Sequence, residues 1–205
     1  MKVLVACEYS GRVRDAFLAR GHDAISCDLL PTDSPGPHYQ GDVFDIIEDS
    51  FDLMIAHPPC TNLAVSGARW FHEKRAQQIK DLRFVQRLLD APMPRIALEN
   101  PVSVISTRIR KPDQTIQPWQ FGHGETKATC LWLKNLPDLR PTDIVPGREQ
   151  VVHMMAPSPD RWKRRSTTYA GIAQAMADQW GSPHLDHWIQ PPLFQGLNEA
   201  VAWNF

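Results

Sequence analysis

KVLVAC, residues 2–7, is a short apolar run rich in valine, and it predicts a buried β-strand. Gly11 follows this run, and Val13, Ala16 and Phe17 then recur at helical spacing. A strand, a tight turn and a helix are therefore expected at the start of the chain. Such a unit favours an α/β fold when strands and helices continue to alternate after it.

The alternation does continue along the chain. Further apolar segments predict strands at residues 24–27, at a segment ending near Asp42, and at 51–56, 95–98 and 128–133. Helices are expected at residues 73–89, 102–107 and 169–180. The pattern predicts a doubly wound, mostly parallel sheet with helices on both faces, whose ligands bind at the carboxyl ends of the strands.

The length of 205 residues fits one ordinary α/β domain with a sizeable core. We expect this domain to span residues 1–181. A proline-rich and polar segment without clear periodicity, at about residues 136–166, is the expected recognition insert. Residues 182–205 form a tail rich in aromatic residues and proline, which is expected to pack on the domain or on a partner.

The composition excludes several classes of protein. Lysine and arginine total 22 against 23 aspartates and glutamates, which argues against a broad DNA-coating surface but permits a local basic patch. The four cysteines and eight histidines show no familiar zinc spacing, so neither disulfides nor a metal site is expected. Because no apolar run is long enough to span a bilayer or to act as a signal peptide, we expect a soluble cytoplasmic protein.

Cys60 is the first candidate for chemistry. It follows an apolar strand and two prolines, so its thiol is expected at a stiff turn on the rim of the sheet. A buried cysteine is more often an inert small hydrophobe. The Pro58-Pro59-Cys60 context nevertheless favours a reactive position, and a thiolate is the group that attacks C6 of a cytosine ring. That reaction also needs an acid beside the nucleophile.

Glu99 ends the next predicted strand and is the candidate for this acid. A carboxyl with a raised pKa could donate to N3 of cytosine while Cys60 attacks. Glu99 could equally cap the helix that follows Asn100 and Pro101. His57, which directly precedes the two prolines, either lines the cleft and tunes the thiol or has a packing or capping role.

These motifs resemble those of the C5-cytosine DNA methyltransferases, and the resemblance runs through most of the chain. Residues 59–67, PCTNLAVSG, resemble the family's Pro-Cys motif and the mobile loop after it. Residues 99–101, ENP, resemble its Glu-Asn-Val motif. Residues 121–129, FGHGETKAT, are similar to Tyr-Gly-x-Pro-Gln-x-Arg-x-Arg, with Lys127 in place of the first arginine and with departures at Glu125 and Thr129.

The resemblance implies a class I, Rossmann-like fold that binds S-adenosylmethionine. The family's glycine-rich first turn is similar to residues 7–13, and the final motif, a helix that closes over the cofactor, is similar to residues 168–173. By this resemblance Asp28 would hold the ribose hydroxyls and Asp42 would accept from the adenine amino group. Either aspartate could instead be a loop or capping residue. The implied cofactor-binding residues are Glu8, Tyr9, Gly11, Asp28, Asp42, Pro58 and Gly171.

Two basic segments are candidates for contacts to nucleic acid. Residues 161–165, RWKRR, form a charge run, which usually marks a solvated face. Beside a methyltransferase cleft, the run could bind phosphates, while Trp162 stacks on a base or fills the space left by a flipped one. A second possible phosphate contact is formed by Arg108, Arg110 and Lys111. The implied substrate-binding residues are Pro59, Thr61, Ser66, Gly67, Asn100, Arg161, Trp162 and Lys163.

The implied activity is methyl transfer from S-adenosylmethionine to C5 of a flipped cytosine in duplex DNA. Cys60 would add to C6 of the ring, and Glu99 would stabilise the protonated N3, with Lys127 as the third catalytic residue. The resembled family normally carries a large target-recognition domain where this chain has only the short insert, and this leaves open the same chemistry on RNA or on a free cytosine nucleotide. A catalytically silent nucleic-acid-binding protein is the third alternative. A compact enzyme with a short insert suits a phage or mobile element in a bacterial cell.

Overall fold

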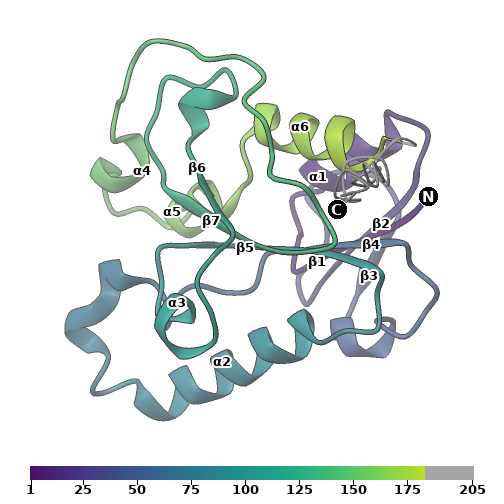
Figure 1. The fold of residues 1–205 in the computed structure, drawn as a ribbon. Helices are drawn as coiled ribbons and strands as arrows, with labels where there is room; N and C mark the ends of the chain where they lie inside the picture. The colour runs from purple at the N-terminus through teal and green to yellow at the C-terminus, as the bar shows by residue number, and fades with distance from the viewer. Residues whose placement is uncertain (183–205) are drawn as a thin grey trace, which may run out of the picture.

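A seven-stranded β-sheet runs through the middle of the protein in the computed structural model (Figure 1). The structure describes residues 1–182. Its strands are hydrogen-bonded in the order β3-β2-β1-β4-β5-β7-β6. The first five strands in this order, from β3 to β5, are parallel to one another. Strand β7 runs antiparallel to both of its neighbours, β5 and β6. The strands are β1 (Lys2–Ala6), β2 (Asp23–Asp28), β3 (His38–Gln40), β4 (Leu53–Ala56), β5 (Arg95–Pro101), β6 (Gln114–Ile116) and β7 (Thr129–Lys134).

Helices cover both faces of this sheet. Figure 1 shows α1 and α6 on one face and α2 and α3 on the other. This arrangement confirms the predicted fold class, a doubly wound and mostly parallel Rossmann-like sheet. The α-helices are α1 (Arg12–Leu18), α2 (Arg75–Leu89), α3 (Ile105–Arg108), α4 (Val151–Met154), α5 (Arg161–Ser166) and α6 (Ala170–Trp180). Three 3-10 turns are η1 (Val43–Asp45), η2 (Val65–Trp70) and η3 (Pro118–Gln120).

One strand was not expected from the sequence. β6 is three residues long, and only Ile116 in it is buried, so it shows neither an apolar run nor a regular alternation. It exists because β7 offers it a hydrogen-bonding edge. Within the segment 136–166, the structure forms the short helices α4 and α5. The predicted tail lies, apart from Ser182, outside the described residues.

The core consists of two layers, one on each face of the sheet. In β1, Val3 and Val5 pack toward α1 and α6, whereas Leu4 packs on the opposite face toward α2. Successive side chains of a strand point to opposite faces, so a strand covered on both sides is apolar at every position. Trp180 of α6 and Trp132 of β7 are fully buried, one in each layer.

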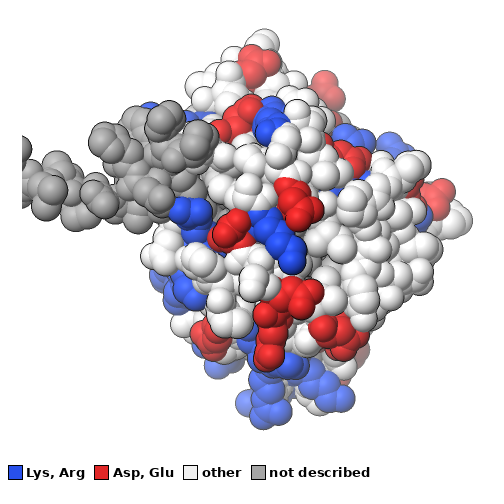
Figure 2. All heavy atoms as spheres, turned by 90° about the vertical axis from the view of Figure 1, so that its right-hand side faces the viewer, with Lys and Arg blue, Asp and Glu red and all other residues white. Residues whose placement is uncertain are grey.

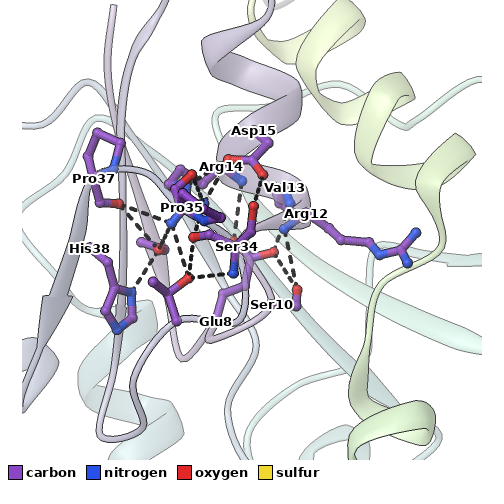
Figure 3. A network of polar contacts seen from close by, with 12 residues as sticks. Glu8, Ser10, Arg12, Val13, Arg14, Asp15, Ser34, Pro35, Pro37 and His38 are labelled. Atoms are coloured by element: carbon purple, nitrogen blue, oxygen red, sulfur yellow. Dashed lines mark hydrogen bonds and ion pairs between the residues drawn. The ribbon is translucent and has the colours of Figure 1, made fainter.

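A fully buried arginine joins α1 to the loop after β2 (Figure 3). The guanidinium of Arg14 donates to the Ser26 hydroxyl at 3.1 Å, the Thr32 hydroxyl at 3.3 Å and the Ser34 carbonyl at 2.9 Å. Its charge is balanced by Asp15 at 2.8 Å. A buried charge needs such partners, because an unpaired one costs several kcal/mol. Arg14 thereby fixes the loop that begins directly after Asp28.

Candidate active site

A cavity of about 620 Å³ opens at the carboxyl ends of the parallel strands. Asp28, Asp42 and Pro59, which follow or end β2, β3 and β4, lie on its sheet side. Lys80 and Arg83 of α2 are among the residues on the other side. Ligands of open α/β sheets bind at this edge, and the volume falls in the range of about 300–1,000 Å³ that is typical of ligand pockets.

The two aspartates predicted to hold the cofactor both line this cavity. Asp28 Oδ1 accepts a hydrogen bond from the backbone N–H of Leu30 at 2.9 Å. Asp42 Oδ1 accepts from the backbone N–H of Phe44 at 3.0 Å and caps η1. Each carboxylate therefore has a structural role. The second oxygen of each makes no hydrogen bond to the described residues, so it is free to accept one from a ligand.

Glu8 lies elsewhere, beneath the first turn of α1 (Figure 3). It is buried, and its two carboxylate oxygens accept from the backbone N–H groups of Val13 at 2.7 Å and Arg14 at 3.2 Å. The Ser10 hydroxyl donates to it as well, at 3.1 Å. These are the unpaired N–H groups of a helix start, where a negative charge is also favourable. Glu8 is therefore engaged as a helix cap.

Tyr9 attaches the first turn to α5. Its hydroxyl lies 2.8 Å from the Ser166 hydroxyl, and its ring centroid is 5.6 Å from that of Trp162. Lys163 forms an ion pair with Asp33 at 3.0 Å in the loop after β2. The basic segment 161–165 is thus anchored against the N-terminal turn, while the Trp162 side chain stays half exposed.

Two glycines in the predicted cofactor set are required by close packing. Gly11 has a φ of 73°, and a side chain there would meet the guanidinium of Arg14. Gly171, at the start of α6, packs directly on the backbone carbonyl of Phe121, where no Cβ fits. Both positions favour glycine for reasons of fold.

Cys60 lies in the turn after β4, where it is partly exposed. Asn100 Nδ2 of β5 donates to the carbonyl of Pro58 at 2.9 Å and holds this turn against the neighbouring strand. Burial raises the pKa of the Cys60 thiol, and the charge of Glu99 raises it further, although Lys127 reduces the rise. The sulfur is therefore a protonated thiol at neutral pH, and it must lose a proton before it can attack.

Glu99 and His57 form a pair beside this turn. Glu99 Oε2 lies 3.1 Å from His57 Nδ1, and the two side chains are 15% and 9% exposed. Burial acts to raise the pKa of Glu99, but the hydrogen bond from His57 and the charges of His57 and Lys127 outweigh it and lower the pKa. The prediction of a raised pKa for Glu99 is therefore wrong, because the sequence did not show that His57, directly after the neighbouring strand β4, is its partner.

Lys127 connects the end of α5 to the surroundings of Cys60 and Glu99. Its Nζ donates to the carbonyl of Arg165 at 2.8 Å, and its charge acts on both Cys60 and Glu99. The structure thus brings together the three residues predicted to be catalytic. By contrast, Thr61 and Ser66 of the loop after Cys60 are exposed, and their side chains form no hydrogen bonds to residues 1–182.

A second cavity of about 470 Å³ lies between three elements, which are the loop after Cys60, the first turn of α2, and α3. Arg75 and Arg108 line it, and neither has an ion-pair partner among the described residues. Arg110, predicted to act with Arg108, is instead paired with Asp113 at 2.7 Å. On the face shown in Figure 2, at the β2 and β3 end of the sheet, basic and acidic side chains are interspersed.

Two further observations concern metals and membranes. Within residues 1–182, no group of three or more histidine, cysteine or acidic side chains is arranged to hold a metal ion. No helix in this part of the chain has the length and apolarity needed to cross a membrane.

Comparisons with known proteins give a distant likeness. No protein-family model matches the chain, and no curated protein matches it. Among solved structures, it is similar to a candidate DNA modification methyltransferase encoded within a prophage of E. coli, with a TM-score of 0.46 and 14% identity. The match covers 71% of this chain and 52% of that one, so this chain spans about half its length. At this distance no residue role carries over.

Proposed function

We propose that the protein transfers a methyl group from S-adenosylmethionine to C5 of cytosine in DNA, with Cys60 as the nucleophile. The observation that supports this most is the convergence of Cys60, Glu99 and Lys127 beside a ligand-sized cavity at the carboxyl edge of the sheet. The thiol lies in the turn after β4 and the carboxylate on the adjacent strand β5, and covalent activation of a pyrimidine requires these two groups.

The cofactor would bind in the larger cavity. The free oxygens of Asp28 and Asp42 can accept hydrogen bonds from ribose hydroxyls and from an adenine amino group. Pro59 connects this cavity to Cys60, so donor and acceptor would meet at the turn after β4. When bound there, S-adenosylmethionine supplies an electrophilic methyl group.

The residues of the chain would divide the remaining chemistry. Cys60 loses its proton and adds to C6 of the ring, which makes C5 nucleophilic. The Glu99 carboxylate accepts a hydrogen bond from the protonated N3 that this addition produces, and Lys127 stabilises negative charge on the thiolate and the carboxylate. Asn100 keeps the Pro58 carbonyl, and with it the turn, in place.

DNA is the favoured substrate because two groups of basic side chains lie near this site. Arg75 and Arg108 line the second cavity without an ion-pair partner among the described residues, and two guanidiniums lining one cavity favour an anion there. The basic segment 161–165 lies on the other side, next to Lys127. Phosphates of a bound strand would satisfy both groups, and a base must leave the stack to reach Cys60.

The test is incubation of the purified protein with labelled S-adenosylmethionine and mixed-sequence DNA, followed by nucleoside analysis. We expect 5-methylcytosine from the wild type and none from Cys60→Ser, with Cys130→Ser as a matched control in β7. Label found only in tRNA or dCMP would support the alternative substrates. N4-methylcytosine or N6-methyladenine as the product would refute the covalent mechanism, and failure to bind S-adenosylmethionine would favour a silent nucleic-acid-binding protein.

A further inference from the structure

His57 is placed beside Glu99 by the register of two neighbouring strands. Ala56 of β4 pairs with Leu98 of β5, so the next residue of each strand lies opposite the other. Both side chains point to the same face of the sheet, where His57 Nδ1 meets Glu99 Oε2 at 3.1 Å. The pair is therefore fixed by the backbone and does not depend on a mobile loop.

The second ring nitrogen of His57 is unsatisfied. Nε2 is buried and has no hydrogen-bond partner among residues 1–182, and the side chain is only 9% exposed. A bare Nε2 buries an acceptor and a protonated one buries a donor, and either is unfavourable without a partner. Such a group is rare in a folded protein, and it needs a reason beyond packing.

The neighbouring charges show why the Glu99 carboxylate alone cannot supply a proton to the cytosine ring. Glu99 has a pKa below its ordinary value despite its burial, because of His57 and Lys127. At neutral pH it therefore carries no proton of its own for a cytosine ring. The cations that act on this cluster, Lys127 and Arg165, are of types that keep their charge across this range. Histidine is the side-chain type that gains and loses a proton between about pH 5 and 8.

We propose that His57 and Glu99 act as one proton-holding pair, which takes up the proton of the Cys60 thiol and returns it to N3 of the pyrimidine. His57 is a positioning residue, since it acts through Glu99. The step is balanced: the S–H bond breaks, the C6–S and N3–H bonds form, and a neutral thiol and a neutral ring give a neutral adduct. The choice of a pyrimidine as the proton acceptor rests on the proposed function.

The first test does not depend on the substrate. Iodoacetamide alkylation of Cys60 is followed by mass spectrometry from mildly acidic to alkaline pH in the protein without DNA. We expect the rate to rise in two steps, one from the pair and one from the thiol. His57→Asn can still donate to Glu99 but cannot take up a proton, so it should show one step. His153→Asn, an exposed histidine in α4, is the matched control.

A single step in the wild type, or two unchanged steps in His57→Asn, would overturn the pairing. Glu99→Gln removes the same step and serves if His57→Asn does not fold, as judged by thermal unfolding. Methyl transfer to cytosine DNA gives the second measurement, in which His57→Asn should be roughly 100-fold slower or more, with a flattened pH profile. Full activity of this variant would refute the inference while leaving the proposed function intact. Absence of 5-methylcytosine from the wild type would refute the function, and the alkylation profile would still decide the pair.

Discussion

Replacing Glu8 by alanine should destabilise the protein without removing a cofactor ligand. The change leaves the backbone N–H groups of Val13 and Arg14 buried without an acceptor. Each such loss costs about 1–3 kcal/mol, so we expect a total of roughly 3 kcal/mol. For a domain of this size that corresponds to a fall in melting temperature of about 6–12 °C. Urea and thermal unfolding, followed by circular dichroism, measure both quantities.

Two comparisons sharpen this prediction. Ser10→Ala removes one partly buried hydrogen bond to Glu8, so it should cost only about 1 kcal/mol. The Glu8→Ala protein, where folded, should bind S-adenosylmethionine about as tightly as the wild type in calorimetry. A variant that melts like the wild type, or one that stays stable but has lost the cofactor, would refute the assignment of Glu8 as a cap.

Four more substitutions have defined outcomes. Gly171→Ala forces a methyl group against the Phe121 carbonyl and should cost about 1–3 kcal/mol in urea unfolding. The pKa of Glu99 is lower in the folded state than its ordinary 4.5, so its ionised form stabilises the fold at neutral pH. This stabilisation is lost as the pH falls below that value. Glu99→Gln should therefore lose less free energy of unfolding in acid than the wild type does. Arg75→Gln and Arg108→Gln should weaken DNA binding and lower the salt slope, by about 0.9 for each phosphate contact removed.

Matched variants control for nonspecific effects. Gly67→Ala has room for the added methyl group, so it should be nearly neutral beside Gly171→Ala. Arg12→Gln removes the same charge on the opposite face, from a side chain that points away from the polar network in Figure 3, and it should leave the salt slope unchanged. Equal slopes in all the arginine variants would contradict a phosphate site in the second cavity, and parallel pH curves would contradict the role of Glu99 in acid.

The sheet and the meeting of Cys60 with Glu99 could be predicted because both depend on local patterns. Apolar runs mark the buried strands, and residues that end neighbouring parallel strands share one edge. The pairing of His57 could not be predicted in this way. Beyond the adjacency of β4 and β5, it requires their exact register, and this follows from the packing of the whole sheet.

The turn after β1, which contains Glu8 and Tyr9, shows the same limit of prediction from sequence. Glu8 and Tyr9 lie where a resemblance would place ligand contacts, but their side chains are engaged by α1 and α5. The partner of Tyr9 lies more than a hundred residues away in the chain, in a segment without periodicity. Contacts between such distant segments leave no local signal, whereas a cap such as Glu8 could have been recognised from an acid just before a helix.

The position of β1 in the middle of the sheet has a consequence for synthesis. Its neighbours are β2 and β4, and β4 begins only at Leu53. At a translation rate of about 5–20 residues per second, the ribosome needs on the order of several seconds to deliver the second neighbour. During that time a valine-rich strand has at least one backbone edge open to other chains. Because β1 is synthesised before β4, the growing chain exposes an unpaired strand edge that other chains can bind. This edge is covered once β4 has paired with β1.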